Sequence, residues 1–159
     1  MARLVRSVDF ERVLRVRSRA TTAHFAVHHL AALPSAPARA RRIRSAPDLS
    51  TSQGIRGASP VDDCASEAPQ PDGQWLGAVV PKRHARRAVT RSLIKRQIYA
   101  AAERHRTELA AGLWVVRLRA PFDRQRFPSA ASAALKLGSR TELDALFGAV
   151  ARPSTESST

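Results

Sequence analysis

The sequence predicts an α+β sandwich, in which helices pack against a single sheet. Hydrophobic residues recur at helical spacing in some segments and alternate in others. These segments follow one another in the order α-β-β-α-β-α, which leaves room for one further strand. At 159 residues the chain is long enough for one compact domain with additional sequence, but not for two full cores. The elements are therefore expected to share one core.

The first two predicted elements lie in residues 1–32. Ser7 can cap a helix, and the apolar residues of this helix recur at helical spacing: Phe10, Val13 and Leu14. Residues 24–30 alternate, which predicts a strand. Phe25 and Val27 share one face of this strand, and the other face carries His24, Ala26 and His28.

Residues 75–119 predict a long helix between two strands. Residues 75–80 form a short apolar run that Pro81 ends, and residues 113–119 alternate, so both segments read as strands. Between them, the residues of one stripe are spaced by four, three and four: Ile94, Ile98, Ala101 and His105. This spacing predicts a helix with one buried edge, and Gly112 is expected to end it.

The last part of the chain predicts two more helical segments. Residues 129–137 can form a short Ala-rich helix that Gly138 stops. The sequence from Ser139 to Glu142 has the spacing of a capping box, and apolar residues follow it at helical spacing. A final helix is therefore expected after Ser139.

Composition separates a folded domain from two segments without a core. Residues 33–73 are rich in Pro, Ala, Ser and Arg and carry almost no large apolar side chains. Such a segment cannot bury enough surface to offset the entropy lost on ordering it. We therefore expect one domain formed by residues 1–32 and 74–150, a disordered insertion at 33–73 and a flexible tail at 151–159.

The net charge indicates a polyanionic partner. The chain has 27 Lys and Arg against 13 Asp and Glu, which gives a net charge of +14 and a pI near 11.7. Such an excess destabilises a compact protein by self-repulsion unless a polyanion neutralises it. Nucleic acid is the first candidate partner, and an anionic membrane surface is the second.

Several other classes of protein do not fit the sequence. The single cysteine, Cys64, can form neither an intrachain disulfide nor a cysteine-based metal cluster. No stretch approaches the roughly 20 apolar residues that span a bilayer. The N-terminus is rich in Arg, but Asp9 and Glu11 argue against an organelle transit peptide. A cytoplasmic protein without a membrane partner is therefore expected.

The sequence gives little support for catalysis by the protein alone. Five histidines could offer acid and base groups: His24, His28, His29, His84 and His105. Most of them fall on a strand or in the buried helical stripe, as structural histidines do. The sequence also has no carboxylate cluster for two divalent ions and no Gly-rich phosphate-binding loop. We therefore expect no catalytic residue and no metal ligand in the protein.

The basic helix within residues 81–111 is the strongest indication of function. Four of its residues share an arc about 100° wide beside the buried stripe: Ser92, Lys95, Arg96 and Tyr99. No acidic residue occurs from Pro81 to Ala102, although an exposed helix flank normally interleaves Glu with Lys. A run of cations without acidic partners is typical of a surface that binds phosphates.

Three short sequences in the folded parts form a recognisable pattern. Residues 77–83 read Gly-Ala-Val-Val-Pro-Lys-Arg, and residues 88–96 read Ala-Val-Thr-Arg-Ser-Leu-Ile-Lys-Arg. Upstream, Asp9-Phe10-x-x-Val13-Leu14 precedes Phe25. Together these sequences resemble the bacterial ribonuclease P protein component over residues 6–31 and 74–120. That family has a strand ending near two basic residues, an Ala-Val step, and an Arg-Asn-x-x-Lys-Arg-x-x-Arg motif on a helix.

The chain departs from the family motif at two positions. Arg91, Lys95 and Arg96 match it, but the motif Asn falls on Ser92 and the last motif Arg falls on Tyr99. Ser92 keeps a hydroxyl and lacks the paired donor and acceptor of the amide. Tyr99 can stack on a base or sugar where the arginine would pair with a phosphate.

The resemblance implies a fold and two RNA-binding surfaces. The fold has a left-handed β-α-β crossover, an exception to the usual right-handed connection. The motif helix is implied to face a catalytic RNA subunit through Lys82, Arg83, Arg87, Arg91, Ser92, Lys95, Arg96 and Tyr99. A cleft on the sheet is implied to bind the single-stranded 5′ leader of precursor tRNA through Phe10, Leu14, Phe25, Val27 and His28.

On this interpretation the chain is the RNA-binding protein subunit of ribonuclease P, a ribonucleoprotein that removes the 5′ leader from precursor tRNA. The RNA subunit would hold Mg²⁺ and perform the hydrolysis, while the protein contributes positive charge and positions the leader. The alternative is a general RNA-binding or ribosome-associated protein of related fold, without a role in tRNA processing. A DNA-binding helix-turn-helix protein fits less well, because predicted strands flank the basic helix.

Overall fold

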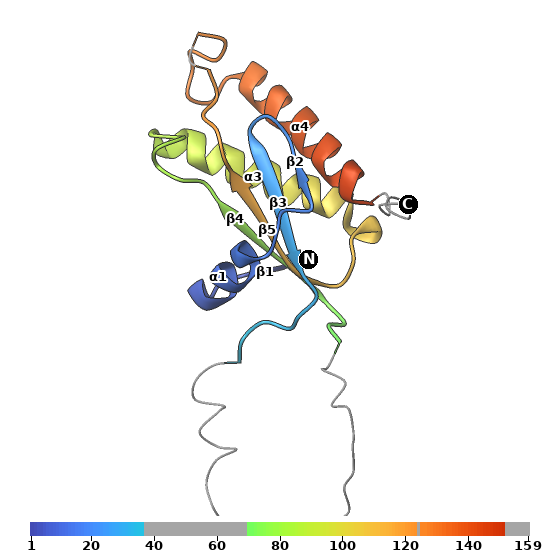
Figure 1. Ribbon diagram of the computed structural model, residues 1–159. Coiled ribbons are helices and arrows are strands. Elements are labelled where there is room, and N and C mark those ends of the chain that lie inside the picture. Colours follow the sequence, from blue (N-terminus) through green and yellow to red (C-terminus); the bar gives the residue numbers. More distant parts are fainter. Residues whose placement is uncertain (37–69, 124, 152–159) are drawn as a thin grey trace, which may run out of the picture.

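The computed structural model describes residues 1–36, 70–123 and 125–151, which form a five-stranded mixed sheet with helices on both faces (Figure 1). The strands are β1 (Ala2–Arg3), β2 (Ala20–Thr21), β3 (Phe25–Leu30), β4 (Gln74–Val79) and β5 (Gly112–Leu118), in the spatial order β1-β4-β5-β3-β2. The helices are α1 (Ser7–Arg15), α3 (Ala88–Arg104) and α4 (Ala133–Ala151), with a 3-10 turn at Arg106–Glu108. The predicted α+β sandwich is confirmed.

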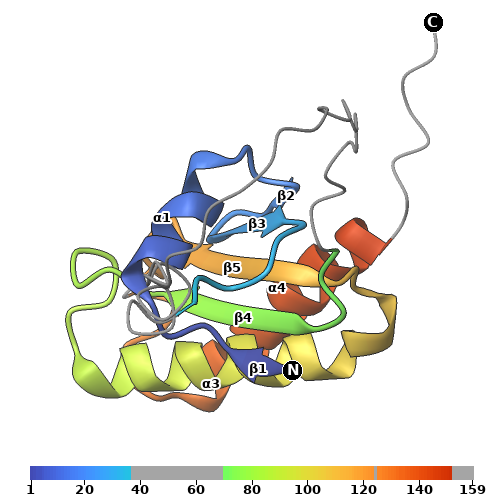
Figure 2. The ribbon, with the colours of Figure 1, turned by 90° about the horizontal axis from the view of Figure 1, so that it is seen from below.

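The sheet separates two apolar clusters. α1 covers one face of the sheet, and α3 and α4 cover the other (Figure 2). Phe25, Trp114 and Phe147 are fully buried on the side of α3 and α4. On the side of α1, Val13 packs with Val115. Because successive strand residues point to opposite faces, the central strand β5 contributes to both clusters.

The connection from β4 through α3 to β5 is a left-handed crossover. β4 and β5 are parallel neighbours, with Trp75 opposite Leu113. In Figure 1 both strands run upward, β5 lies to the right of β4, and α3 lies behind the sheet. This hand is rare among β-α-β units. It puts the basic helix α3 and the helix α1 on opposite sides of the sheet.

Helix boundaries differ from the sequence prediction at two glycines. Residues 133–151 form one continuous helix across Gly138 rather than two helices. Leu135 and Leu143 are buried on this helix, and their packing outweighs the weak helix preference of glycine. Gly112 does not end α3, which stops at Arg104; it opens β5 with a φ of 127°, a conformation that favours glycine.

Three smaller differences concern the ends of elements. Arg6, not Ser7, is the capping residue of α1. His105, predicted in the buried stripe, is instead the residue that follows α3, and its Nδ1 lies 2.9 Å from Glu108 Oε2. The structure adds two strands, β1 and β2, where the sequence left room for one; each has two residues, too few to show a period.

The first residues of the predicted insertion pack against α1. Asp9 is buried, and its carboxylate accepts hydrogen bonds from the backbone N–H of Ser35 at 3.0 Å and from the Ser35 hydroxyl at 2.6 Å. Arg12 Nη1 lies 3.2 Å from the same carboxylate. Residues 33–36 therefore belong to the domain, which corrects the predicted start of the insertion. The remainder, 37–69, and residues 152–159 of the predicted tail lie outside the described residues.

Candidate nucleic-acid interface

The basic residues predicted to bind RNA gather at one end and along one flank of α3. The helix buries Leu93, Ile94 and Ile98 against the core. Its first turn contains no acidic residue. The exposed members of the predicted set lie in the preceding loop, at the cap and on the outer flank: Lys82, Arg83, Arg87, Ser92, Lys95 and Arg96. These six residues are exposed, and their role in binding RNA stays a prediction.

Arg91 differs from its neighbours because its guanidinium bonds to the protein itself. It is half-buried, and Nη1 donates to the carbonyl oxygens of Ala85 at 3.0 Å and Arg86 at 2.6 Å. These bonds hold the loop that precedes α3. Arg91 is therefore a residue that positions the basic loop, and only its remaining N–H groups can reach a phosphate.

The ring of Tyr99 contacts an arginine from another element, Arg3, which the sequence analysis did not identify. The guanidinium carbon of Arg3 lies 4.7 Å from the centroid of the Tyr99 ring, within the range of a cation–π contact. Arg3 is exposed on β1, which pairs with β4 at Leu76. The guanidinium of Arg3 therefore places a positive charge beside Tyr99, one helical turn from Arg96. The residue of α3 at this position is not itself basic.

The loop before α3 also fixes the orientation of Arg83. Arg83 Nε donates to His84 Nε2 at 3.1 Å. The pKa of His84 lies below its ordinary value, first because of burial and then because of the charges of Arg83 and Arg117. These influences favour the neutral imidazole, which accepts the Arg83 N–H.

The face of the sheet toward α1 holds three of the five residues predicted for the leader cleft. Phe10 and Leu14 are half-buried on α1 and pack on the cluster around Val115. His28 is partly exposed on β3, and its Nδ1 lies 2.8 Å from the carbonyl oxygen of Val16. These three side chains share one face.

Phe25 and Val27 do not belong to that face, and the prediction is corrected for both. They point from β3 toward α3 and α4, and both are 0% exposed. The strand alternation that places His28 on the α1 side places its odd-numbered neighbours on the other side. A single-stranded RNA on the α1 side therefore cannot reach them.

Arg117 is a residue of the α1 side that the sequence analysis did not assign to a site. It lies on the central strand β5, opposite Ala26 on β3 and Val79 on β4. It is half-buried, and its side chain forms no hydrogen bond or ion pair with any described residue. In the sequence, Arg117 alternates with Leu113 and Val115, and this pattern could have shown that the three side chains share one face. We call His28, Val79 and Arg117 the α1-side strip.

The histidines do not form a common catalytic site. His24 Nδ1 lies 2.6 Å from Glu142 Oε1, and His29 stacks on Trp114 at 4.1 Å between centroids. Within residues 1–36, 70–123 and 125–151, no group of three or more His, Cys, Asp or Glu could hold a metal ion. Among the helices of these ranges, none combines the length and apolar character needed to cross a membrane.

Known proteins are similar to this chain in sequence and in fold. A family model described as Ribonuclease P matches residues 1–142. The ribonuclease P protein component of Bordetella parapertussis is 42% identical over 89 residues, which cover 56% of this chain and 68% of the relative. The ribonuclease P protein component of Burkholderia pseudomallei is 43% identical over 77 residues, which cover 48% of this chain and 57% of the relative.

Solved structures agree with the assignment of the fold. The RNase P protein of Staphylococcus aureus aligns over 96% of both chains with a TM-score of 0.53 and 18% sequence identity. The solved structures support the fold alone, whereas the family model and the curated relatives support assignment to a family. The chain therefore belongs to the ribonuclease P family, as a protein subunit of the kind that assists an RNA in tRNA processing.

Proposed function

We propose that this chain assists a catalytic RNA subunit in the endonucleolytic removal of the 5′ leader from precursor tRNA. The observation that supports this proposal is that two groups of residues suited to contact RNA lie on opposite sides of one sheet. One is the cationic flank of α3, and the other is the α1-side strip with Arg117 at its centre. A protein with two such surfaces can contact two RNA molecules at once.

The flank of α3 is proposed to bind the RNA subunit. Lys95 and Arg96 are exposed and neighbour each other on a helix that offers no acidic partner in its first turn. Cations in this arrangement bind phosphates of any sequence and release counterions from the RNA. They also lower the repulsion between the RNA subunit and the tRNA, which are both polyanions.

The α1-side strip is proposed to bind the single-stranded leader. The half-buried Arg117 can pair with a backbone phosphate, and the partly exposed imidazole of His28 can stack on a base. Phe10 and Leu14 form the apolar border of this strip on α1. A leader bound here would be oriented relative to the RNA subunit on the other side of the sheet, which lowers the entropy cost of cleavage.

The hydrolysis itself is assigned to the RNA subunit, with Mg²⁺ bound by the RNA. The described residues do not fit a resident metal, because they contain no cluster of three potential ligands. The protein's own contribution is to bind, orient and neutralise charge. A cytoplasmic location is expected for such a subunit.

Reconstitution tests the proposal directly. The purified chain and a cognate RNA subunit are combined with precursor tRNA at physiological salt, and release of the 5′ leader is measured. The proposal predicts faster cleavage, at lower salt and Mg²⁺, than with the RNA subunit alone. A chain that binds many RNAs equally and leaves cleavage unchanged would instead be the general RNA-binding protein considered above.

A further inference from the structure

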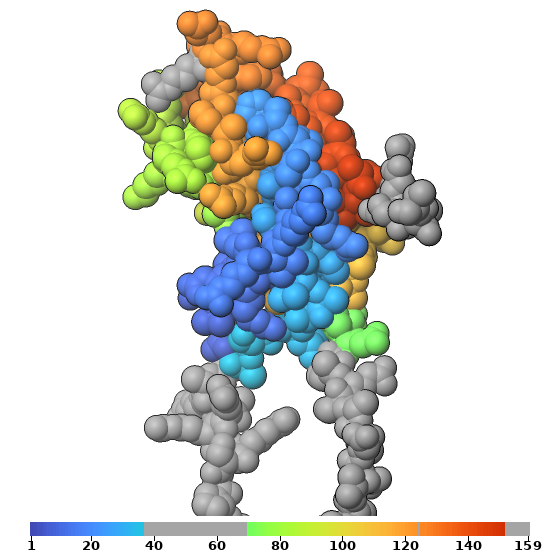
Figure 3. Space-filling view, viewed as in Figure 1, coloured from blue at the N-terminus to red at the C-terminus, as the bar shows by residue number. Residues whose placement is uncertain are grey.

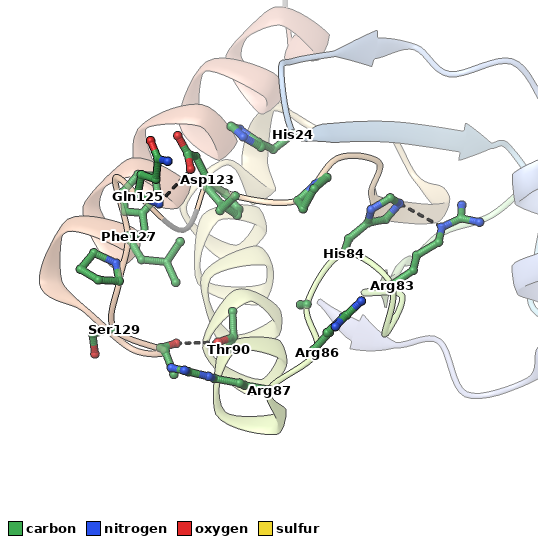
Figure 4. A pocket seen from close by; sticks show the side chains of 16 residues that line it. His24, Arg83, His84, Arg86, Arg87, Thr90, Asp123, Gln125, Phe127 and Ser129 are labelled. Atoms are coloured by element: carbon green, nitrogen blue, oxygen red, sulfur yellow. Dashed lines mark hydrogen bonds between the residues drawn. The ribbon is translucent and has the colours of Figure 1, made fainter.

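A pocket lies beside the start of α3, where the loop of residues 81–87 meets the loop that follows β5. Figure 3 shows the two loops as neighbours at the upper end of the molecule, and Figure 4 shows the lining side chains. The pocket has a volume of about 690 Å³. Sites for small organic ligands span roughly 300–1,000 Å³, so a single nucleotide fits a pocket of this size.

One wall of the pocket is cationic. Arg83, Arg86 and Arg87 line it. The loop that carries them is held by Arg91, whose guanidinium donates to the carbonyl oxygens of Ala85 and Arg86. Within the loop, His84 accepts the Arg83 N–H. The side chains of Arg86 and Arg87 form no hydrogen bond or ion pair with other described residues, which leaves them available to a phosphate.

The opposite end of the pocket is aromatic. The rings of His24 and Phe122 stack with 4.1 Å between centroids and 11° between planes. Phe127 meets Phe122 edge-on at 5.7 Å. Glu142 fixes the stack by accepting the backbone N–H of His24 at 3.2 Å and contacting its ring at 2.6 Å. A flat aromatic surface of this kind suits a nucleobase.

Two polar side chains, Asp123 and Gln125, also line the pocket and lie near His24 at its aromatic end (Figure 4). Asp123 Oδ1 accepts the backbone N–H of Gln125 at 2.9 Å, which orients the carboxylate. Asp123 forms no ion pair with another residue of the described ranges, although three arginines line the same pocket. A carboxylate and an amide can read the donor and acceptor groups on the edge of a base.

We propose that this pocket binds one unpaired RNA nucleotide, with its phosphate on the arginine wall, its base against His24 and Phe122, and the edge of the base at Asp123 and Gln125. The inference rests on the proposed function in one respect, namely that the chain works on RNA. The nucleotide comes either from the RNA subunit or from the precursor tRNA. An unstacked base taken up by stacking and edge contacts is the usual way in which proteins read single-stranded RNA.

Footprinting of the assembled ribonucleoprotein at single-nucleotide resolution tests the pocket. The informative variant is Asp123→Ala with Gln125→Ala, because it removes the edge contacts without removing a cation. The wild-type chain should protect one unpaired base, and the double variant should return that base to the reactivity it has without protein. Arg126→Ala is the matched control, since Arg126 is exposed on the same loop and does not line the pocket. Identical footprints for the wild type and the double variant would overturn the proposal.

Cross-linking identifies the source of the nucleotide. Gln125→Cys, in a chain with Cys64→Ser, carries a photoreactive group into the pocket. A cross-link confined to the protected base supports the proposal, and its position in the RNA subunit or in the precursor tRNA names the source. Cross-links spread evenly over both RNAs would contradict it. A protected base without any stimulation of leader removal would refute the proposed function and would still support the pocket as a nucleotide-binding site.

Discussion

The ring of Phe10 on α1 lies directly against the α-carbon of Gly77 on β4. A Cβ atom built on Gly77 would stand 2.3 Å from Cε1 of Phe10 and 2.6 Å from its Cζ. No real side chain tolerates such a distance, so the glycine sets how closely α1 approaches the sheet. Because Phe10 and Leu14 border the α1-side strip, this contact also sets the position of one edge of the proposed leader site.

Gly77→Ala should therefore destabilise the chain and move α1. The added methyl group forces the Phe10 ring away, and overpacking of this kind costs about 1–3 kcal/mol. Chemical denaturation measures the effect. Gly148→Ala is the control, because nothing lies within 4 Å of a Cβ at this position of α4. It should stabilise the chain by about 0.5–1 kcal/mol, as alanine replaces glycine in a helix. Equal stabilities of the two variants would refute the account of Gly77.

Arg3 should behave as a member of the α3 flank although it lies on β1. Arg3→Ala should weaken binding of the RNA subunit and lower the slope of log affinity against log salt by about 0.7–0.9, the value for one phosphate contact. Adding Tyr99→Arg should restore both quantities, because the cation then comes from α3 itself. Salt titrations of the single and double variants decide the matter. An unchanged slope in Arg3→Ala would mean that the arginine only packs on Tyr99.

Acid should destabilise the fold in part through His29. Burial is the main reason that the pKa of His29 lies below its ordinary value of 6.5, with Arg19 adding to it and the bond to Ala111 opposing it. The folded chain therefore binds fewer protons than the unfolded chain, and stability is lost as the pH falls through 6.5. His29→Phe keeps an aromatic ring on Trp114 and cannot titrate. Its denaturation midpoint should depend less on pH between 7 and 5 than that of the wild type. Parallel pH profiles would contradict the assignment.

The insertion should be replaceable only in part. Leu30 and Gln74 lie at the same end of the sheet, beside Leu113 and Gly112, so a short Gly/Ser bridge can join the flanking segments. Replacement of residues 37–69 should keep tRNA processing. Replacement of 33–73 should lower the unfolding temperature, because it removes the Ser35 groups that satisfy the buried Asp9 carboxylate. Equal unfolding temperatures of the two variants would show that this contact contributes nothing.

The order of the long elements could be predicted from the sequence because their periods are clear. The alternation of residues 24–30 and the stripe of Ile94, Ile98 and Ala101 are local signals, and the structure confirms both. β1 and β2 could not be predicted, because two residues show no period. The continuous helix across Gly138 depends on tertiary packing, which local preference does not contain.

The candidate sites were harder to predict for the same reason. Alternation showed that Phe25 and Val27 share a face, but it could not show which face α3 and α4 cover. Arg117 was hidden among the apolar residues of β5, although its period placed it with Leu113 and Val115. The pocket joins His24, Arg86 and Phe122, which are far apart in the chain, so only the folded structure brings them together.

The central claim is that the two sides of the sheet bind different RNAs, and a comparison of precursor and mature tRNA tests it most directly. Arg117→Gln and Lys95→Ala variants are assembled with the RNA subunit, and both tRNA forms are titrated against each complex. Arg117→Gln should weaken precursor binding by roughly tenfold or more, as expected when a charge-assisted hydrogen bond is lost, and should leave mature tRNA binding unchanged, since mature tRNA has no leader. Lys95→Ala should act equally on both forms, and excess protein should reverse its effect. Equal losses for precursor and mature tRNA with Arg117→Gln would contradict the account.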